Sequence, residues 1–196
     1  MPLGANKAAI MGVAGTAAAA DVVLLSEGAF TNQTTVSFTS EITSTYGEYI
    51  FGFYNISPAS DSVDFQFQVN ADGESGYNET ITSTSFMAHG YEDGGGSSMN
   101  YQTAEDQANG TAFQTIADIV GNGADESLDG HLHLFNPSST TYVKHFYSII
   151  NGYTEGNYSV ANYAAGYIND TTAIDDIQFK MSSGNFDGTI KMWGVK

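Results

Sequence analysis

The sequence contains no cysteine, and this absence excludes disulfide bonds, thiolate catalysis and zinc sites built from thiolates. Arginine is missing too, and five lysines stand against 22 Asp and Glu residues, so the formal net charge is −17 at pH 7. Contacts to nucleic-acid phosphates and to anionic lipid surfaces require Lys and Arg. We therefore expect no nucleic-acid partner and no attraction to anionic membranes.

Long apolar runs are also missing, since none approaches the roughly 18 residues that a membrane-spanning helix needs, and we expect no membrane insertion. Aromatic residues, in contrast, make up 13% of the chain, and 22 glycines accompany many Ser, Thr and Asn residues. This composition favours short strands joined by turns. Because only 14% of the residues are charged, the surface must be largely neutral and polar.

Alternating apolar and polar residues predict about ten strands. The clearest is 63–69, where Val63, Phe65, Phe67 and Val69 alternate with polar side chains. The other predicted strands cover residues 22–25, 36–38, 49–56, 80–88, 112–120, 130–135, 142–150, 158–168, 177–181 and 189–195. We expect a single all-β domain over residues 21–196, an antiparallel β-sandwich, with residues 89–110 as its longest irregular loop.

The closing segment, residues 173–196, predicts a pair of strands locked into the sheet. In its last strand Trp193 and Val195 share one face, and Ile190 and Met192 share the other. Apolar side chains on both faces indicate a strand that is covered on both sides. We expect a neighbouring subunit to cover the face of Trp193.

Residues 1–20 differ from the rest, because they are rich in Ala and Gly and contain no aromatic residue. A lysine followed by an apolar stretch that ends in small residues is one feature of a secretory signal, although Gly12 and Gly15 interrupt the stretch. The alternative is a short helix or extended arm that docks on another chain. In that case Ile10, Met11 and Val13 are the expected assembly contacts.

Four stretches of the sequence resemble tail and capsid-surface proteins of marine bacteriophages: residues 41–58 (EITSTYGEYIFGFYNISP), 63–77 (VDFQFQVNADGESGY), 131–146 (HLHLFNPSSTTYVKHF) and 173–196. The beginning, LGANKAAIMGVAG, is similar to the start of such virion proteins. The resemblance implies a jelly-roll-like sandwich that is displayed on a virion as an oligomer, often a trimer. It implies no catalytic signature.

His131 and His133 lie two residues apart on a predicted strand, so both imidazoles point to one face. Together with His145 or a carboxylate from Asp129 they would bind zinc or another divalent ion in a cupin-like pocket. The alternative is a polar strand face or a contact between subunits.

Asp72 and Glu74, in the stretch NADGE, place carboxylates in a glycine-containing turn, as calcium sites do, and residues 125–130 (DESLDG) do the same. Neither stretch has the spacing of an EF-hand, and Asp, Asn and Gly are ordinary turn residues. Calcium and a plain turn both remain open.

Tyrosines form the last group of candidates: Tyr91 and Tyr101 in the long loop, and Tyr153 and Tyr158 further along. Tyr combines apolar area with a hydroxyl group, which suits stacking on sugars or anchoring a protein interface. We expect the loop pair to be exposed.

The leading hypothesis is a non-enzymatic virion structural protein, made in the host cytoplasm and carried on the particle as capsid decoration or as part of a tail or fibre. It would be a homo-oligomer, with a trimer favoured, attached to other virion proteins through residues 1–20. The alternatives are an appendage that binds host-surface glycans and a cupin-like metal protein. Nucleophile-elbow and zinc-protease motifs are missing from the sequence, and facing carboxylates of a glycosidase would not be visible in it.

Overall fold

The computed structural model describes residues 21–154 and 156–196. These residues form thirteen strands and no helix: β1 (Val22–Gln33), β2 (Thr35–Phe38), β3 (Glu48–Pro58), β4 (Val63–Ala71), β5 (Ile81–Tyr91), β6 (Ser97–Tyr101), β7 (Ala108–Gly110), β8 (Gln114–Val120), β9 (Leu128–Phe135), β10 (Lys144–Thr154), β11 (Tyr158–Ile168), β12 (Ile174–Met181) and β13 (Phe186–Val195). Among them, no helix has the length and apolar character of a membrane span.

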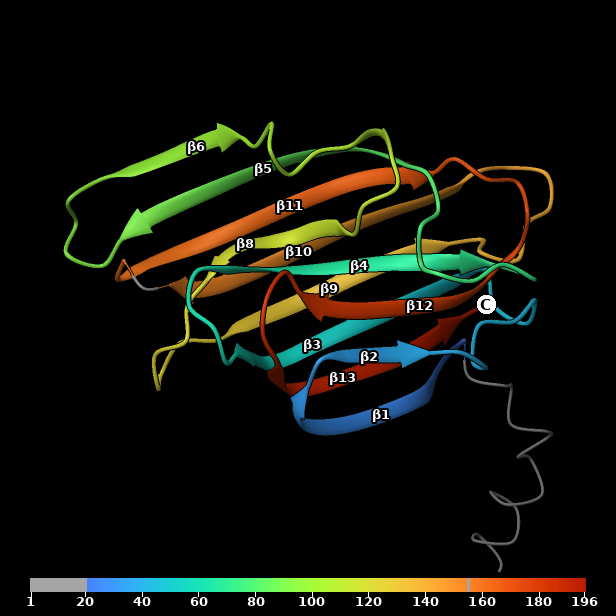
Figure 1. Cartoon of the computed structure of the whole chain (residues 1–196), viewed down its shortest axis with the longest axis horizontal. Helices are drawn as coiled ribbons and strands as arrows, with labels where there is room; N and C mark the ends of the chain where they lie inside the picture. The colour runs from blue at the N-terminus through green and yellow to red at the C-terminus, as the bar shows by residue number, and fades with distance from the viewer. Residues whose placement is uncertain (1–20, 155) are drawn as a thin grey trace, which may run out of the picture.

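Two antiparallel sheets pack face to face, as the sequence predicts (Figure 1). The nine-stranded sheet has the order β1-β13-β3-β9-β10-β11-β5-β6, with β7 also paired to β5, and the four-stranded sheet has the order β2-β12-β4-β8. If β5 to β7 and β10 to β11 are set aside, eight strands remain, in the orders β1-β13-β3-β9 and β2-β12-β4-β8. When these eight strands are renumbered from 1 to 8 along the chain, the two orders become 1-8-3-6 and 2-7-4-5. This is the strand order of a jelly roll.

The remaining strands are two insertions into that jelly roll, and they pair with each other. β10 and β11 form a hairpin after β9, and β11 pairs with β5 from Tyr158↔Tyr91 to Ile168↔Ile81. The large sheet is thereby continued by β10, β11, β5 and β6, which we call the sheet extension. In Figure 1 the small sheet lies in front of β13, β3 and β9 of the large sheet, whereas β5 and β6 project beyond it.

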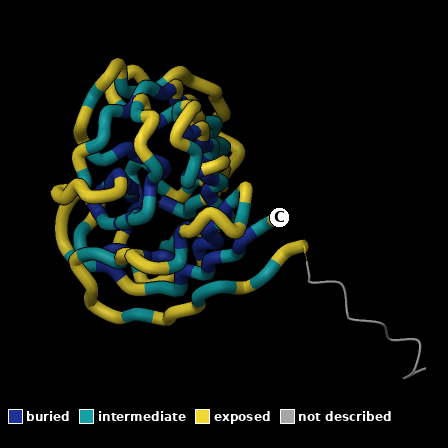
Figure 2. Tube along the Cα trace, turned by 90° about the vertical axis from the view of Figure 1, so that its right-hand side faces the viewer, coloured by how far each residue is buried: buried dark blue, intermediate teal, exposed yellow. Residues whose placement is uncertain are grey.

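The core lies between the sheets and follows from the alternation of each strand. Phe179 of β12 packs at ring-centroid distances of 5.4 Å from Phe51 and 5.3 Å from Phe53, both on β3 of the opposite sheet. Phe65 and Phe67 of β4 join the same cluster and are fully buried. Figure 2 shows the buried segments inside a layer of exposed and intermediate residues. Edge-to-face aromatic contacts of this kind add stabilisation beyond area burial.

The buried Lys144 side chain anchors the extension to the jelly roll. It lies at the start of β10, has no exposed surface, and its Nζ donates hydrogen bonds to the carbonyl oxygens of Asp170 and Thr172. Both carbonyls belong to the connection from β11 back to β12. A buried ammonium group is tolerated when its donors are satisfied in this way.

The prediction of an irregular loop over residues 89–110 is wrong. This stretch contains the end of β5 and the strands β6 and β7, which pair with β5. The closing strands are confirmed: β13 lies between β1 and β3, with Ile190 and Met192 buried and Trp193 and Val195 half-buried on the other face. Residues 1–20, including Ile10, Met11 and Val13, lie outside the described part of the chain.

Candidate functional site

The outer face of the large sheet, which faces away from the small sheet, carries a continuous row of ring-bearing and apolar side chains. The register of the strand pairing places these side chains in one row, because residues that are directly paired on neighbouring strands point to the same side of the sheet. It crosses five strands and consists of His131, Ile149, Tyr163, Phe86 and Tyr101. In the middle of it, the rings of Phe86 and Tyr163 are stacked, with centroids 4.8 Å apart and planes 8° from parallel.

Exposed apolar side chains concentrate on this face. By the alternation of the strands, seven of the nine large hydrophobic residues that are exposed point to it: Val22, Leu24, Tyr54, Phe86, Met99, Tyr101 and Ile149. The side chain of Met99 is 71% exposed and that of Tyr101 is 53% exposed. Such a concentration is typical of interaction surfaces, whereas scattered exposed hydrophobic residues are ordinary.

Charge is missing from the part of this face that belongs to the extension. Along the described strands β10, β11, β5 and β6, Lys144 is the single Asp, Glu, Lys or Arg residue, and it is buried. Tyr147, Ile149, Tyr163, Phe86 and Met99 therefore project from a neutral surface in a chain of net charge −17. We call this surface the neutral face.

The predicted histidine pair lies at the border between the jelly roll and the neutral face. His131 and His133 point to the same side, as expected, with ring centroids 4.9 Å apart. His133 is stacked on Tyr147 at 4.5 Å and its Nδ1 pairs with Glu48 Oε1. Partial burial, with a smaller contribution from His133, lowers the pKa of His131, which favours its neutral form.

Metal ligands do not gather around this pair within the described ranges. No group of three or more His, Cys, Asp or Glu residues there has the arrangement of a metal site. Glu48 contacts Nδ1 of His133 and leaves Nε2 as the nitrogen that would face a metal, but the described residues supply no third ligand beside the two histidines. The rings are better explained as part of the aromatic ladder with Phe135 and Tyr147.

Trp193 extends the apolar surface across β13. Its ring lies over Gly52 of β3, where an added Cβ would come within 2.8 Å of the indole ring and 3.1 Å of Tyr54. Beside it, Lys191 pairs with Glu27 at 2.7 Å and lies 5.4 Å from the Tyr54 ring centroid. The glycine is therefore required by the packing of the indole ring against the sheet.

The four predicted tyrosines do not form one site. Tyr91 and Tyr158 lie 4.9 Å apart at the tip of the extension, and the hydroxyl of Tyr153 donates to Asn157 nearby, at 2.8 Å. Tyr101 lies on the edge strand β6, at the border of the neutral face, and its hydroxyl donates to Asp106, which follows β6 in the chain, at 2.5 Å. This hydrogen bond raises the pKa of Tyr101. Tyr91 and Tyr101 are both exposed, as expected.

Asp72 and Glu74 lie in a tight turn after β4. Gly73 has a positive φ of 84°, the Glu74 N–H donates to the Ala71 carbonyl at 2.9 Å, and the Asp72 N–H donates to the Ala173 carbonyl at 2.7 Å. These hydrogen bonds explain the Asp and Gly residues as turn formers. In the second stretch, Asp129 accepts a hydrogen bond from the Asn55 N–H at 3.0 Å.

An acidic pair lies on neighbouring strands of the small sheet. Burial, followed by the nearby charges of Glu105 and Asp64, raises the pKa of Asp118 to about 6.

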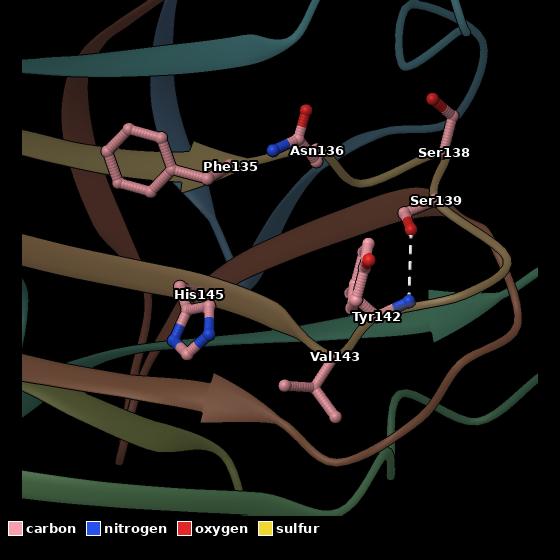
Figure 3. A pocket seen from close by; sticks show the side chains of 7 residues that line it. All are labelled: Phe135, Asn136, Ser138, Ser139, Tyr142, Val143 and His145. Atoms are coloured by element: carbon pink, nitrogen blue, oxygen red, sulfur yellow. Dashed lines mark hydrogen bonds between the residues drawn. The ribbon is translucent and has the colours of Figure 1, made fainter.

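A pocket of about 530 Å³ opens where β9 passes into β10, and we call it the β9–β10 pocket (Figure 3). The rings of Phe135, Tyr142 and His145 surround it, together with the polar side chains of Asn136 and Ser138. Sequence reasoning singled out only His145 among these residues, as a metal ligand. The strand alternation and the motif FNPSSTTY were visible, but a pocket formed by a turn and two strands depends on how the turn folds back.

The neutral face was also missed, although its signal was in the sequence. The segments 81–91, 144–154 and 158–168 contain a single charged residue in a chain with 22 carboxylates. What the sequence did not show is that these segments become neighbours, because β5 and β11 lie far apart in the chain and pair from Tyr91↔Tyr158 to Ile81↔Ile168.

No family model and no curated protein matches this chain. A structural similarity exists to a Bacteroides ovatus protein of unknown function, with 5% sequence identity and a TM-score of 0.29, over 76% of this chain and 90% of that one. A similarity this weak assigns neither a family nor a function.

Proposed function

We propose that this chain is a non-enzymatic structural protein of a bacteriophage particle, and that it assembles as a homo-oligomer through the neutral face. The single observation that carries the proposal is the absence of charge from the outward positions of the described strands β10, β11, β5 and β6. The resemblance of residues 41–58, 63–77, 131–146 and 173–196 to virion proteins supports the same role.

The physical reason is the cost of removing charge from water. Interface cores are depleted of charged residues and enriched in Tyr, Phe and Met, because a charge that is buried without a partner is strongly destabilising. Phe86, Tyr163, Tyr147 and Met99 provide the residue types that such a core requires. A stacked Phe86–Tyr163 pair is also rigid, so little side-chain entropy is lost when a partner covers it.

The occupant that we assign to the neutral face is a second copy of this chain. Two molecules with a net charge of −17 repel each other, and the repulsion is smallest where neither contributes a carboxylate. A face without charge therefore favours self-association, whereas a basic partner would be attracted to the acidic remainder of the surface. A trimer is the favoured assembly, located on the capsid surface or in a tail or fibre, with residues 1–20 attached to other virion proteins.

Gradient-purified particles of the phage that encodes this chain provide the test of the virion role. Immunogold labelling with antibodies against residues 21–196, together with mass spectrometry of the particles, should place the chain on the outside in multiple copies. A lysate of infected cells, cleared of particles, is the control. If the chain remained in that cleared lysate and were absent from the particles, the virion role would be wrong.

A further inference from the structure

The β9–β10 pocket is a built cavity with a rigid wall. The Asn136 N–H donates to the Gly47 carbonyl at 2.7 Å, and the Ser139 N–H donates to the Asn136 carbonyl at 3.0 Å. Ser139 Oγ accepts a hydrogen bond from the Tyr142 N–H at 3.1 Å, which is the dashed line in Figure 3. The Pro137 carbonyl accepts from the Ile174 N–H at 2.8 Å, which fastens the turn to the small sheet. The turn is therefore organised before any ligand arrives.

Aromatic rings form the sides of the pocket. Tyr142 is 73% exposed, so its ring contributes little to the stability of the fold and offers its faces to a ligand. The Phe135 ring is held in orientation by Tyr147, at a centroid distance of 5.8 Å and an angle of 30°. His145 is held by Tyr167 at 6.0 Å. Figure 3 shows the three rings arriving from the end of β9, from the turn and from β10.

Polar groups that the protein itself does not use complete the lining. Within the described residues, the side chains of Asn136, Ser138 and His145 make no hydrogen bond, while Ser139 Oγ accepts from backbone N–H groups and keeps its own proton to donate. An amide, two hydroxyls and an imidazole supply both donors and acceptors. None of the residues that line the pocket is an Asp, Glu, Lys or Arg.

We propose that the β9–β10 pocket binds a neutral sugar, namely a pyranose unit of a glycan. A pyranose ring has apolar C–H faces, which stack on aromatic rings, and a rim of hydroxyl groups, which pair with amide, hydroxyl and imidazole groups. The volume of about 530 Å³ lies in the range of small-ligand sites, about 300–1,000 Å³. The net charge of −17 opposes anionic ligands, and the lining has no carboxylate to attract a cation.

Sugar binding in the β9–β10 pocket does not depend on the virion role or on self-association. The pocket is bounded by residues of one copy, from the end of β9 to the start of β10. Its loss would leave the neutral face intact, because Tyr142 projects from the turn and Phe86, Tyr163 and Met99 lie elsewhere on the sheet.

Titration of the full-length protein with glucose, galactose, mannose, N-acetylglucosamine and their disaccharides tests the proposal, by saturation-transfer NMR and calorimetry. At least one sugar should bind saturably. Tyr142→Ala should weaken that binding about tenfold or more, which corresponds to about 1.4 kcal/mol or more, because the stacking ring is removed. Tyr142→Phe keeps the ring and should retain the affinity within about threefold. The matched control is Tyr91→Ala, an exposed tyrosine at the tip of the extension, which should leave binding unchanged.

Three results would overturn the sugar site. The first is that none of these sugars binds saturably up to about 50 mM, a concentration well above the millimolar range of weak single-sugar affinities. The second is equal binding by wild type and Tyr142→Ala, with heteronuclear NMR spectra that show both to be folded. The third is preference for glucuronic acid over glucose. Sedimentation of Tyr142→Ala should match the wild type, so failure here and failure of the assembly proposal are distinguishable.

Discussion

Phe86 of β5 and Tyr163 of β11 stack almost parallel, 4.8 Å apart, in the part of the sheet where the strands carry no charged outward side chain, although the protein is strongly acidic. The two residues belong to different insertions into the jelly roll, one before β8 and one after β9. Their contact exists only because the insertions pair with each other. The extension is therefore one structural unit, and its neutral face is the feature that a minimal jelly roll would not have.

Gly52→Ala should destabilise the fold by about 1–3 kcal/mol, because the new methyl group would come within 2.8 Å of the Trp193 ring. Trp193 is the single tryptophan, so its fluorescence reports the displacement specifically. Urea unfolding and the emission maximum are the measurements. Gly28→Ala on β1, where nothing lies within 4 Å of the added Cβ, is the control and should change neither. Unchanged emission in Gly52→Ala would show that the indole ring does not lie over Gly52.

Lys144→Met should destabilise the protein by about 2–3 kcal/mol, since the carbonyl groups of Asp170 and Thr172 would lose their buried donor. Hydrogen exchange should rise most in β10 and β11, which this residue fastens to the jelly roll. Lys180→Met, a partly exposed lysine whose ammonium group lies 4.3 Å from the Phe113 ring centroid, should cost less than about 1 kcal/mol. An equal loss of stability in the two variants would contradict the anchoring role of Lys144.

Asp118→Asn should stabilise the protein at pH 8 and have little effect at pH 3. The folded-state pKa of about 6 lies above the ordinary value of 3.8, so the folded protein binds the proton more tightly than the unfolded chain. The carboxylate therefore costs stability above pH 6, and this cost declines as the pH falls from about 6 to 3.8. After allowance for solvent screening, a gain of about 1 kcal/mol is expected at pH 8.

Urea unfolding at both pH values measures this difference, with Glu74→Gln in an exposed turn as the control. A stability gain of the same size at pH 3 and pH 8 would mean that charge is not its cause.

Much of the fold could be predicted from the sequence, because burial on one side leaves a period of two in each strand. The strand at Val63 to Val69 and the two faces of the closing strand were predicted correctly for this reason. The topology of the thirteen strands could not be predicted, because strands that pair from distant parts of the chain leave no local pattern in the sequence. β6, with the sequence SSMNY and all five residues exposed, lacks even the alternation that identifies a strand.

The candidate sites divide in the same way. The common orientation of His131 and His133 follows from strand geometry alone and was predictable. The contacts of His133 with Glu48 and Tyr147 were not predictable, because these two residues belong to other strands of the sheet. The exposure of Tyr91 and Tyr101 was predicted, but these residues lie in different places because β5 and β6 present them to opposite faces.

Sedimentation velocity of Ile149→Asp beside the wild type tests the assembly through the neutral face most directly. Ile149 is 40% exposed and pairs with both His131 and Tyr163, so a carboxylate there enters the middle of the face without disturbing the core.

Ser37→Asp is the control on the small sheet, where the new side chain still accepts the hydrogen bond from Gln178. The wild type and Ser37→Asp should sediment as the same homo-oligomer at about 10–50 µM, and Ile149→Asp as a folded monomer, because an unpaired charge buried at an interface costs several kcal/mol. A monomeric wild type, or an Ile149→Asp protein that remains oligomeric, would contradict the proposed role of the neutral face.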